Sequence, residues 1–142
     1  MASKNSQSET IKEAVTAATR AISGNKELEI NFGGMGSSLP HPPKTLKELS
    51  AYRGKADSLA CVEKYRDKSV RITANNEKVN SLIKVMEDSR VEILGSMNYP
   101  GIATNIKSKF DDKCKLYESF EDHEDHLEIA LERWLRNLCL PN

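Results

Sequence analysis

The amino-acid sequence predicts a mainly α-helical domain of four to five helices, with a small β or extended element near residues 27–40. Three observations predict this class. Apolar residues recur at the three- and four-residue spacing of helices over most of the chain. Only one short segment alternates polar and apolar residues as a strand does. The 142 residues, 30% of them charged and 6% aromatic, are typical of a charged helical protein and fit one domain.

Charge and cysteine content exclude several classes of protein. Lys plus Arg equals Asp plus Glu, 21 each, so no electrostatic footprint for nucleic acid or an anionic membrane is present. No apolar run approaches the roughly 18 residues that span a bilayer. Residues 1–10 lack the apolar region of a signal peptide. Cys61, Cys114 and Cys139 show no CxxC spacing and are expected to be reduced thiols. We therefore expect a cytoplasmic protein.

The N-terminal segments are predicted from capping and turn signals. Polar residues 1–8 are expected to form a disordered tail ahead of a single domain at 9–140. Thr10 and Glu13 match a capping box and predict the start of the first helix, and Gly24 predicts its end. One face of this helix is apolar and consists of Ile11, Ala14, Val15, Ala18 and Ile22.

The one strand signal lies at residues 27–32, where polar and apolar residues alternate. The glycine-rich segment 33–38 follows as a flexible turn, because it lacks the Lys-Ser/Thr pair of a phosphate-binding loop. Three prolines then require an extended backbone over residues 39–43.

Four further helices are predicted, at residues 46–72, 77–94, 102–110 and 119–138. Thr45 and Glu48 form a second capping-box pattern before the first of them. Gly54 lies inside that helix and indicates either a close approach of another helix or a tolerated weakness of about 1 kcal/mol. In the last helix, one face is apolar and consists of Leu127, Ala130, Leu131, Trp134 and Leu138.

Arg90 lies in an unexpected place in the helix predicted at 77–94, because it falls on the apolar stripe. The stripe consists of Val79, Leu82, Ile83, Met86, Ile93 and Leu94. An unpaired buried charge is very costly, so an arginine there needs a carboxylate or several carbonyl partners. Segment 86–106 is therefore predicted either to organise a polar core or to present a binding surface.

Arg53 and Asp57 lie one helical turn apart and are predicted to pair along their helix. If the helices at 46–72 and 77–94 pack antiparallel, Asp57 also meets Arg90. One interpretation is a structural ion-pair network, since such networks perturb charges without catalysing a reaction. The functional alternative is a polar seam that binds a partner subunit.

His123 and His126 are weak candidates for metal ligands. They are spaced by three residues, whereas a zinc-protease helix places its two histidines four apart. The acidic residues around them are better explained as the first turn of a helix, where carboxylates complement the helix dipole. No catalytic set of residues is predicted.

Six segments of the chain occur in an order that resembles a known family. The segments are 20–22 (RAI), 27–33 (ELEINFG), 39–43 (LPHPP), 53–60 (RGKADSLA), 89–95 (SRVEILG) and 101–106 (GIATNI). The resemblance is to the N-terminal region of the CobT subunit of aerobic cobaltochelatase, over about residues 17–106 and more weakly to 140.

The resemblance implies a role in cobalamin biosynthesis. In that family three subunits insert cobalt into hydrogenobyrinic acid a,c-diamide in a reaction that consumes ATP. A large subunit holds the corrin, an AAA+ ATPase subunit hydrolyses ATP, and the T subunit assembles with the ATPase. The family's C-terminal von Willebrand A domain and its metal-adhesion motif are absent from this chain. Arg66-Asp67 also stands where the family usually has His-Asp.

By this resemblance the chain is expected to be a subunit-interaction domain that is not catalytic alone. ATP, Mg and cobalt are implied for the whole complex and no cofactor for this chain; homo-oligomerisation stays open. The expected polar-core organisers or partner contacts are Arg53, Asp57, Arg90, Glu92 and Asn105. The alternatives are a standalone helical adaptor and a small metalloenzyme that uses His123 and His126.

Overall fold

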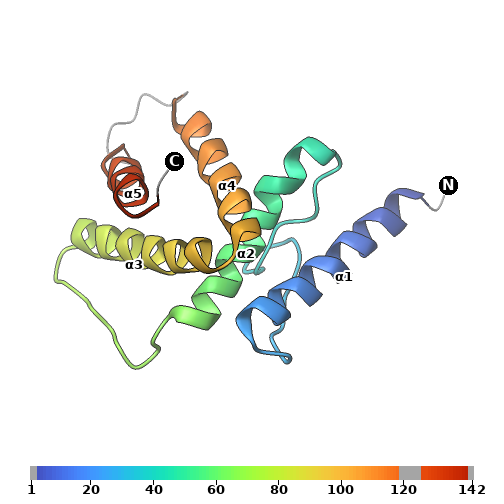
Figure 1. Ribbon diagram of the computed structural model, residues 1–142, viewed down its shortest axis with the longest axis horizontal. Helices are drawn as coiled ribbons and strands as arrows, with labels where there is room; N and C mark the ends of the chain where they lie inside the picture. Colours follow the sequence, from blue (N-terminus) through green and yellow to red (C-terminus); the bar gives the residue numbers. More distant parts are fainter. Residues whose placement is uncertain (1–2, 119–125, 141–142) are drawn as a thin grey trace.

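The computed structural model describes residues 3–118 and 126–140, which form a mainly α-helical structure, as predicted. α2 lies at the centre, α1 and α4 pack along it, α3 contacts α2 and α4, and α5 packs against α3 (Figure 1). None of the described helices is both long and apolar enough to cross a bilayer. The elements are α1 (Ser3–Ser23), η1 (Leu46–Glu48), α2 (Leu49–Tyr65), α3 (Glu77–Asn98), α4 (Pro100–Glu118) and α5 (His126–Cys139).

The predicted strand at residues 27–32 is wrong. Over the described ranges the only extended pairing is an isolated bridge between Phe32 and Leu39. The chain loops round between these two residues, with Gly33, Gly34 and Gly36 at φ of +73°, +83° and +77°, a region that favours glycine, and the two bridged segments run parallel. The bridge therefore closes a loop with no further segment to pair with. It places Leu39, only 2% exposed, against the core.

Helix boundaries near the N-terminus differ from the prediction. α1 begins at Ser3, so the described part of the expected tail is helical. Thr10 is not a cap, because its hydroxyl donates to the Ser6 carbonyl at 2.8 Å inside the helix. α2 ends at Tyr65, because Arg66 adopts an extended backbone, and the chain from 66 to 76 carries no helix.

The C-terminal helices also have different bounds. α3 runs through Gly95 to Asn98, because Gly95 is buried in the helix against the Cys61 sulfur and is not a stop. α4 begins at Pro100, which suits a first helical turn because that position needs no backbone donor. The predicted start of the last helix at Ser119 lies outside the described residues.

The apolar core has two clusters that share α2. One joins α1 and α2 and consists of Val15, Leu39, Tyr52 and Ala56. The other joins α2, α3 and α4 and consists of Cys61, Val91, Ile102 and Ile106. α4 approaches α2 so closely that a Cβ at Gly54 would overlap the Asn105 carbonyl oxygen and lie 2.8 Å from Lys109 Cβ. Gly54 thus marks a close helix–helix approach, the first of its two interpretations.

α5 packs with its polar side inward. Its buried residues are Glu132 and Arg136. Leu127, Trp134 and Leu138 are 61%, 59% and 67% exposed. The apolar face that a surface helix normally buries is directed away from the body of the domain.

Candidate functional site

A network of buried and half-buried polar side chains, here called the polar seam, joins α2, α3, α4 and α5. Glu92 of α3 lies at its centre and is 4% exposed. One carboxylate oxygen of Glu92 accepts hydrogen bonds from the Ser58 hydroxyl at 2.7 Å and from the Lys109 ammonium. The other accepts from the Arg136 guanidinium at 3.2 Å. The residues of the seam are Ser58, Glu92, Lys109, Lys113, Glu132 and Arg136.

Glu132 is the second carboxylate of the seam. It accepts a hydrogen bond from Lys113 at 2.9 Å, and its other oxygen lies 3.7 Å from Arg136 Nε. Burial disfavours the Lys113 ammonium, but the hydrogen bond and the charge of Glu132 outweigh burial and raise the lysine pKa. The Arg136 guanidinium also lies 4.9 Å from the centre of the Phe110 ring, a cation–π contact. Each carboxylate is therefore bonded to cations of other helices.

A second polar branch joins α2 and α4 beside the seam. Asp57 is 5% exposed and accepts a hydrogen bond from the Asn105 side chain at 2.8 Å. The Asn105 amide oxygen accepts from the Ser50 hydroxyl at 3.4 Å. Burial raises the pKa of Asp57, and the Asn105 hydrogen bond and the Arg53 charge offset only part of this effect. Asp57 and Asn105 are thus polar-core organisers.

The predicted ion pairs of Asp57 are wrong. Arg53 is exposed and no ion pair with Asp57 forms among the described residues. Arg90 is also exposed, with 47% of its side chain accessible, and pairs with Glu87 at 2.7 Å. It also donates to the Tyr65 carbonyl at 3.1 Å, which satisfies an orphan acceptor at the end of α2.

The fully buried face of α3 shares only Ile93 with the predicted apolar stripe. Val79 and Met86 on the stripe are 42% and 50% exposed. The buried face carries Ser89, Val91, Glu92, Ile93, Gly95 and Ser96. The charged side chain that α3 buries is therefore that of Glu92, not that of Arg90.

Sequence reasoning named Glu92 but missed its partners Lys109 and Arg136 and the Lys113–Glu132 pair. Glu132 and Arg136 stand four residues apart, a spacing that places them on one side of a helix. Nothing in that spacing shows that this side packs inward. The link to Glu92 spans 44 residues of sequence.

The metal candidates gain no ligand set. His123 lies outside the described residues, and His126 is exposed in the first turn of α5. Within 3–118 and 126–140 no group of three or more His, Cys, Asp or Glu side chains could hold a metal ion.

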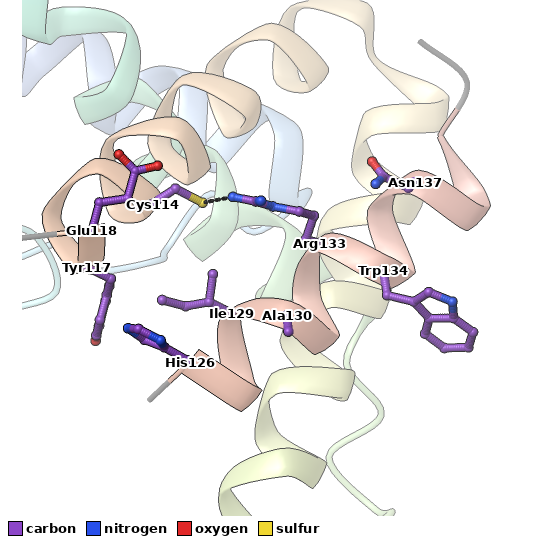
Figure 2. Close-up of a pocket in the computed structure, with 9 residues that line it drawn as sticks. All are labelled: Cys114, Tyr117, Glu118, His126, Ile129, Ala130, Arg133, Trp134 and Asn137. Carbon is purple, nitrogen blue, oxygen red and sulfur yellow. Dashed lines mark hydrogen bonds between the residues drawn. The ribbon is translucent and has the colours of Figure 1, made fainter. Parts of the chain in front are cut away.

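A crevice of about 480 Å³ lies between the C-terminal half of α4 and α5 (Figure 2). The Arg133 guanidinium donates to the Cys114 sulfur at 3.3 Å across it. Figure 2 shows the Trp134 indole directed away from the other labelled side chains.

The three cysteines are free thiols, as predicted. Burial and the charges of Glu92 and Asp57 raise the pKa of Cys61 to about 12, so this thiol is not a ready nucleophile.

Comparison with protein-family models assigns most of the chain to a family. The model described as "Cobalamin biosynthesis protein CobT" matches residues 5–139. This range includes both polar branches and every described residue of α2, α3, α4 and α5. No solved structure significantly matches the chain.

Proposed function

The chain belongs to the CobT family of cobalamin biosynthesis proteins, and from this premise we propose that it is the N-terminal subunit-interaction domain of an ATP-dependent cobaltochelatase. In this proposal the complex inserts cobalt into hydrogenobyrinic acid a,c-diamide in the cytoplasm. This chain contributes binding surface, and the metal insertion itself takes place on another subunit.

The exposed apolar face of α5 is the observation that carries this proposal. Leu127, Trp134 and Leu138 keep more than half of their surface accessible. Clusters of large exposed apolar side chains mark sites of protein–protein contact. The carboxylates of Glu92 and Glu132, by contrast, are bonded to cations inside the domain and hold α5 in place. The buried carboxylates thus stabilise the fold, and the exposed apolar side chains of α5 are available for contact with another subunit.

The proposed partners are the AAA+ ATPase subunit and the large corrin-binding subunit. ATP and Mg belong to the ATPase subunit, and cobalt is the substrate of the complex. Family membership and the exposed face of α5 support this assignment. A standalone helical adaptor is the alternative, and it predicts that the chain leaves chelatase activity unchanged.

Reconstitution of the three-subunit chelatase tests the proposal. We expect an excess of this chain to compete with the complete T subunit for the ATPase subunit, and therefore to inhibit cobalt insertion in a dose-dependent manner. An equal concentration of an inert protein controls for crowding. Corrin absorbance reports cobalt insertion, and co-purification with the ATPase subunit reports binding.

Deletion of residues 1–140 from the complete T subunit provides the second measurement. We expect the shortened subunit to lose co-purification with the ATPase and at least tenfold of the activity. Full activity of the shortened subunit, or no inhibition by a saturating excess of this chain, would overturn the proposal.

A further inference from the structure

Four residues on the outward face of α5 form a continuous apolar stripe. The members at its ends and centre, Leu127, Trp134 and Leu138, are 61%, 59% and 67% exposed. Leu131 lies between them and is half-buried. We call this set, Leu127, Leu131, Trp134 and Leu138, the apolar stripe of α5.

The spacing of the stripe is that of a helix–helix seam. Its members are four, three and four residues apart, the alternation that lines the contact in a coiled coil. Glu132 and Arg136 lie on the opposite side of α5 and are bonded to Lys113 and Glu92 of the domain. Because these bonds fix the rotation of α5, the helix cannot turn to bury the stripe against its own domain.

We propose that the apolar stripe pairs with the same stripe of a second copy of this chain, with the two α5 helices antiparallel about a two-fold axis. A two-fold interface requires a patch that is complementary to itself. The four-three-four spacing reads the same in both directions. An antiparallel pair therefore places Leu127 against the partner's Leu138 and Leu131 against the partner's Trp134. Each residue of the stripe then faces a stripe residue of the other copy.

The residues beside the stripe agree with this pairing. Three of the four flanking positions are uncharged, namely Ala130, Leu135 and Asn137. The fourth, Glu128, lies beside the partner's Leu135, so like charges do not meet between the two α5 helices. A parallel pair would instead place the two Trp134 indoles against each other and would align the like ends of the helix dipoles.

The size of the surface sets the strength of the contact. Stable interfaces use roughly 20–30 residues from each partner, whereas the whole of α5 has 14 residues. The dimer is therefore weak and reversible, and the association depends on protein concentration. This inference concerns two copies of one chain and does not depend on the chelatase assignment. The dimer covers the same face of α5 that supports the proposed function, so self-association and binding of the ATPase subunit compete for it.

Sedimentation and light scattering of the full chain across a concentration series test the pairing. We expect the mass to rise toward twice the 15.9 kDa of one chain as concentration increases. The double variant Trp134→Glu with Leu138→Glu places two charges on the stripe and is expected to weaken self-association by at least tenfold.

A matched control is available in the loop between α2 and α3. Val70 and Ile72 are 58% and 69% exposed, nearly the values of Trp134 and Leu138. The double variant Val70→Glu with Ile72→Glu adds the same charge and is expected to dimerise as the wild type does. Circular dichroism verifies that both variants are folded. A wild-type chain that stays monomeric up to millimolar concentration, or equal losses in both double variants, would contradict the inference.

Cysteine cross-linking reports the orientation of the helices. In a Cys139→Ser background, a Leu127→Cys chain mixed with a Leu138→Cys chain is expected to give a mixed disulfide dimer on oxidation. Each chain alone is expected to give none. Efficient cross-linking of either chain with itself would overturn the antiparallel arrangement. A monomeric wild type that still inhibits the chelatase would refute the dimer and leave the proposed function standing.

Discussion

Glu92 is the residue on which the four-helix arrangement depends most. Its side chain is 6% exposed and contacts Lys109 of α4 and Arg136 of α5. Glu92→Ala removes the carboxylate to which Lys109, Arg136 and the Ser58 hydroxyl all donate hydrogen bonds. We expect the free energy of unfolding to fall by about 3–5 kcal/mol, the usual cost of breaking a buried ion pair from one side. Urea denaturation measures this loss.

Arg90→Ala is the control for Glu92→Ala. Arg90 and its partner Glu87 are 47% and 34% exposed, so solvent screens their interaction. The expected loss is about 0–1 kcal/mol, as for other exposed ion pairs. If Arg90→Ala costs as much as Glu92→Ala, the structural ranking of the two residues is wrong.

Asp57 makes stability depend on pH in a defined direction. Burial raises its pKa in the folded state above the unfolded value of 3.8, so the folded state binds the proton more tightly. Proton binding by Asp57 therefore adds to the free energy of unfolding. This contribution is complete below pH 3.8 and is lost as the pH rises through the pKa of Asp57 in the folded state. Asp57→Asn keeps an acceptor for Asn105 and abolishes the titration.

We therefore expect Asp57→Asn to gain stability relative to the wild type as the pH rises from acid to neutral. Urea denaturation at several pH values measures the difference between the two proteins, in which the titration of all other groups cancels. The Asp112→Asn variant, at an exposed position, controls for the loss of one carboxylate. If the free energy of unfolding of Asp57→Asn falls relative to that of the wild type as the pH rises, the raised pKa of Asp57 is refuted.

At the scale of the elements, the α2–α4 contact is set by Gly54. A methyl group there would overlap the Asn105 backbone and crowd Lys109 Cβ at 2.8 Å. Alanine favours a helix by about 1 kcal/mol over glycine, but overpacking against a backbone costs about 1–3 kcal/mol. We expect Gly54→Ala to lower the melting temperature, with a net loss of about 1–2 kcal/mol.

Gly101→Ala is the matched comparison, because a Cβ at Gly101 in α4 meets nothing within 4 Å. We expect its stability to be unchanged or raised by up to about 1 kcal/mol. Thermal unfolding followed by circular dichroism compares the two variants. Equal effects would show that the α2–α4 approach tolerates a side chain.

Local signals predicted some helix boundaries and missed others, such as the start of α1 at Ser3, seven residues before the predicted cap at Thr10. The start of α3 at Glu77 follows from Asn76, whose side chain accepts from the backbone of Lys78 at 2.8 Å. The predicted strand at 27–32 is wrong because alternating polar and apolar residues indicate a half-buried segment but do not supply a second strand to pair with it. The segment after the glycine turn forms only a single bridge with it. Gly95 failed as a stop because its close neighbour, Cys61, comes from another helix.

At the scale of the whole molecule, the sequence predicted the mainly α class and named Asp57, Glu92 and Asn105, all of which are buried. It did not predict their partners, because hydrogen-bond pairs such as Asp57–Asn105 join residues 48 positions apart. It also did not predict which side of α5 faces inward. Periodicity identifies the two faces of a helix, but neighbouring helices decide which face is buried.

The inverted packing of α5 has a consequence for the order in which the protein comes apart. The buried residues of α5 are an acid and a base, whereas α1, α2, α3 and α4 share apolar contacts. Local opening is easiest where little apolar surface is buried, so we expect α5 to open as a separate unit of lower stability than α1–α4. Salt weakens its partly accessible Lys113–Glu132 pair while apolar contact between two stripes is unaffected or strengthened. Rising ionic strength thus weakens the attachment of α5 to its own domain without weakening association between copies.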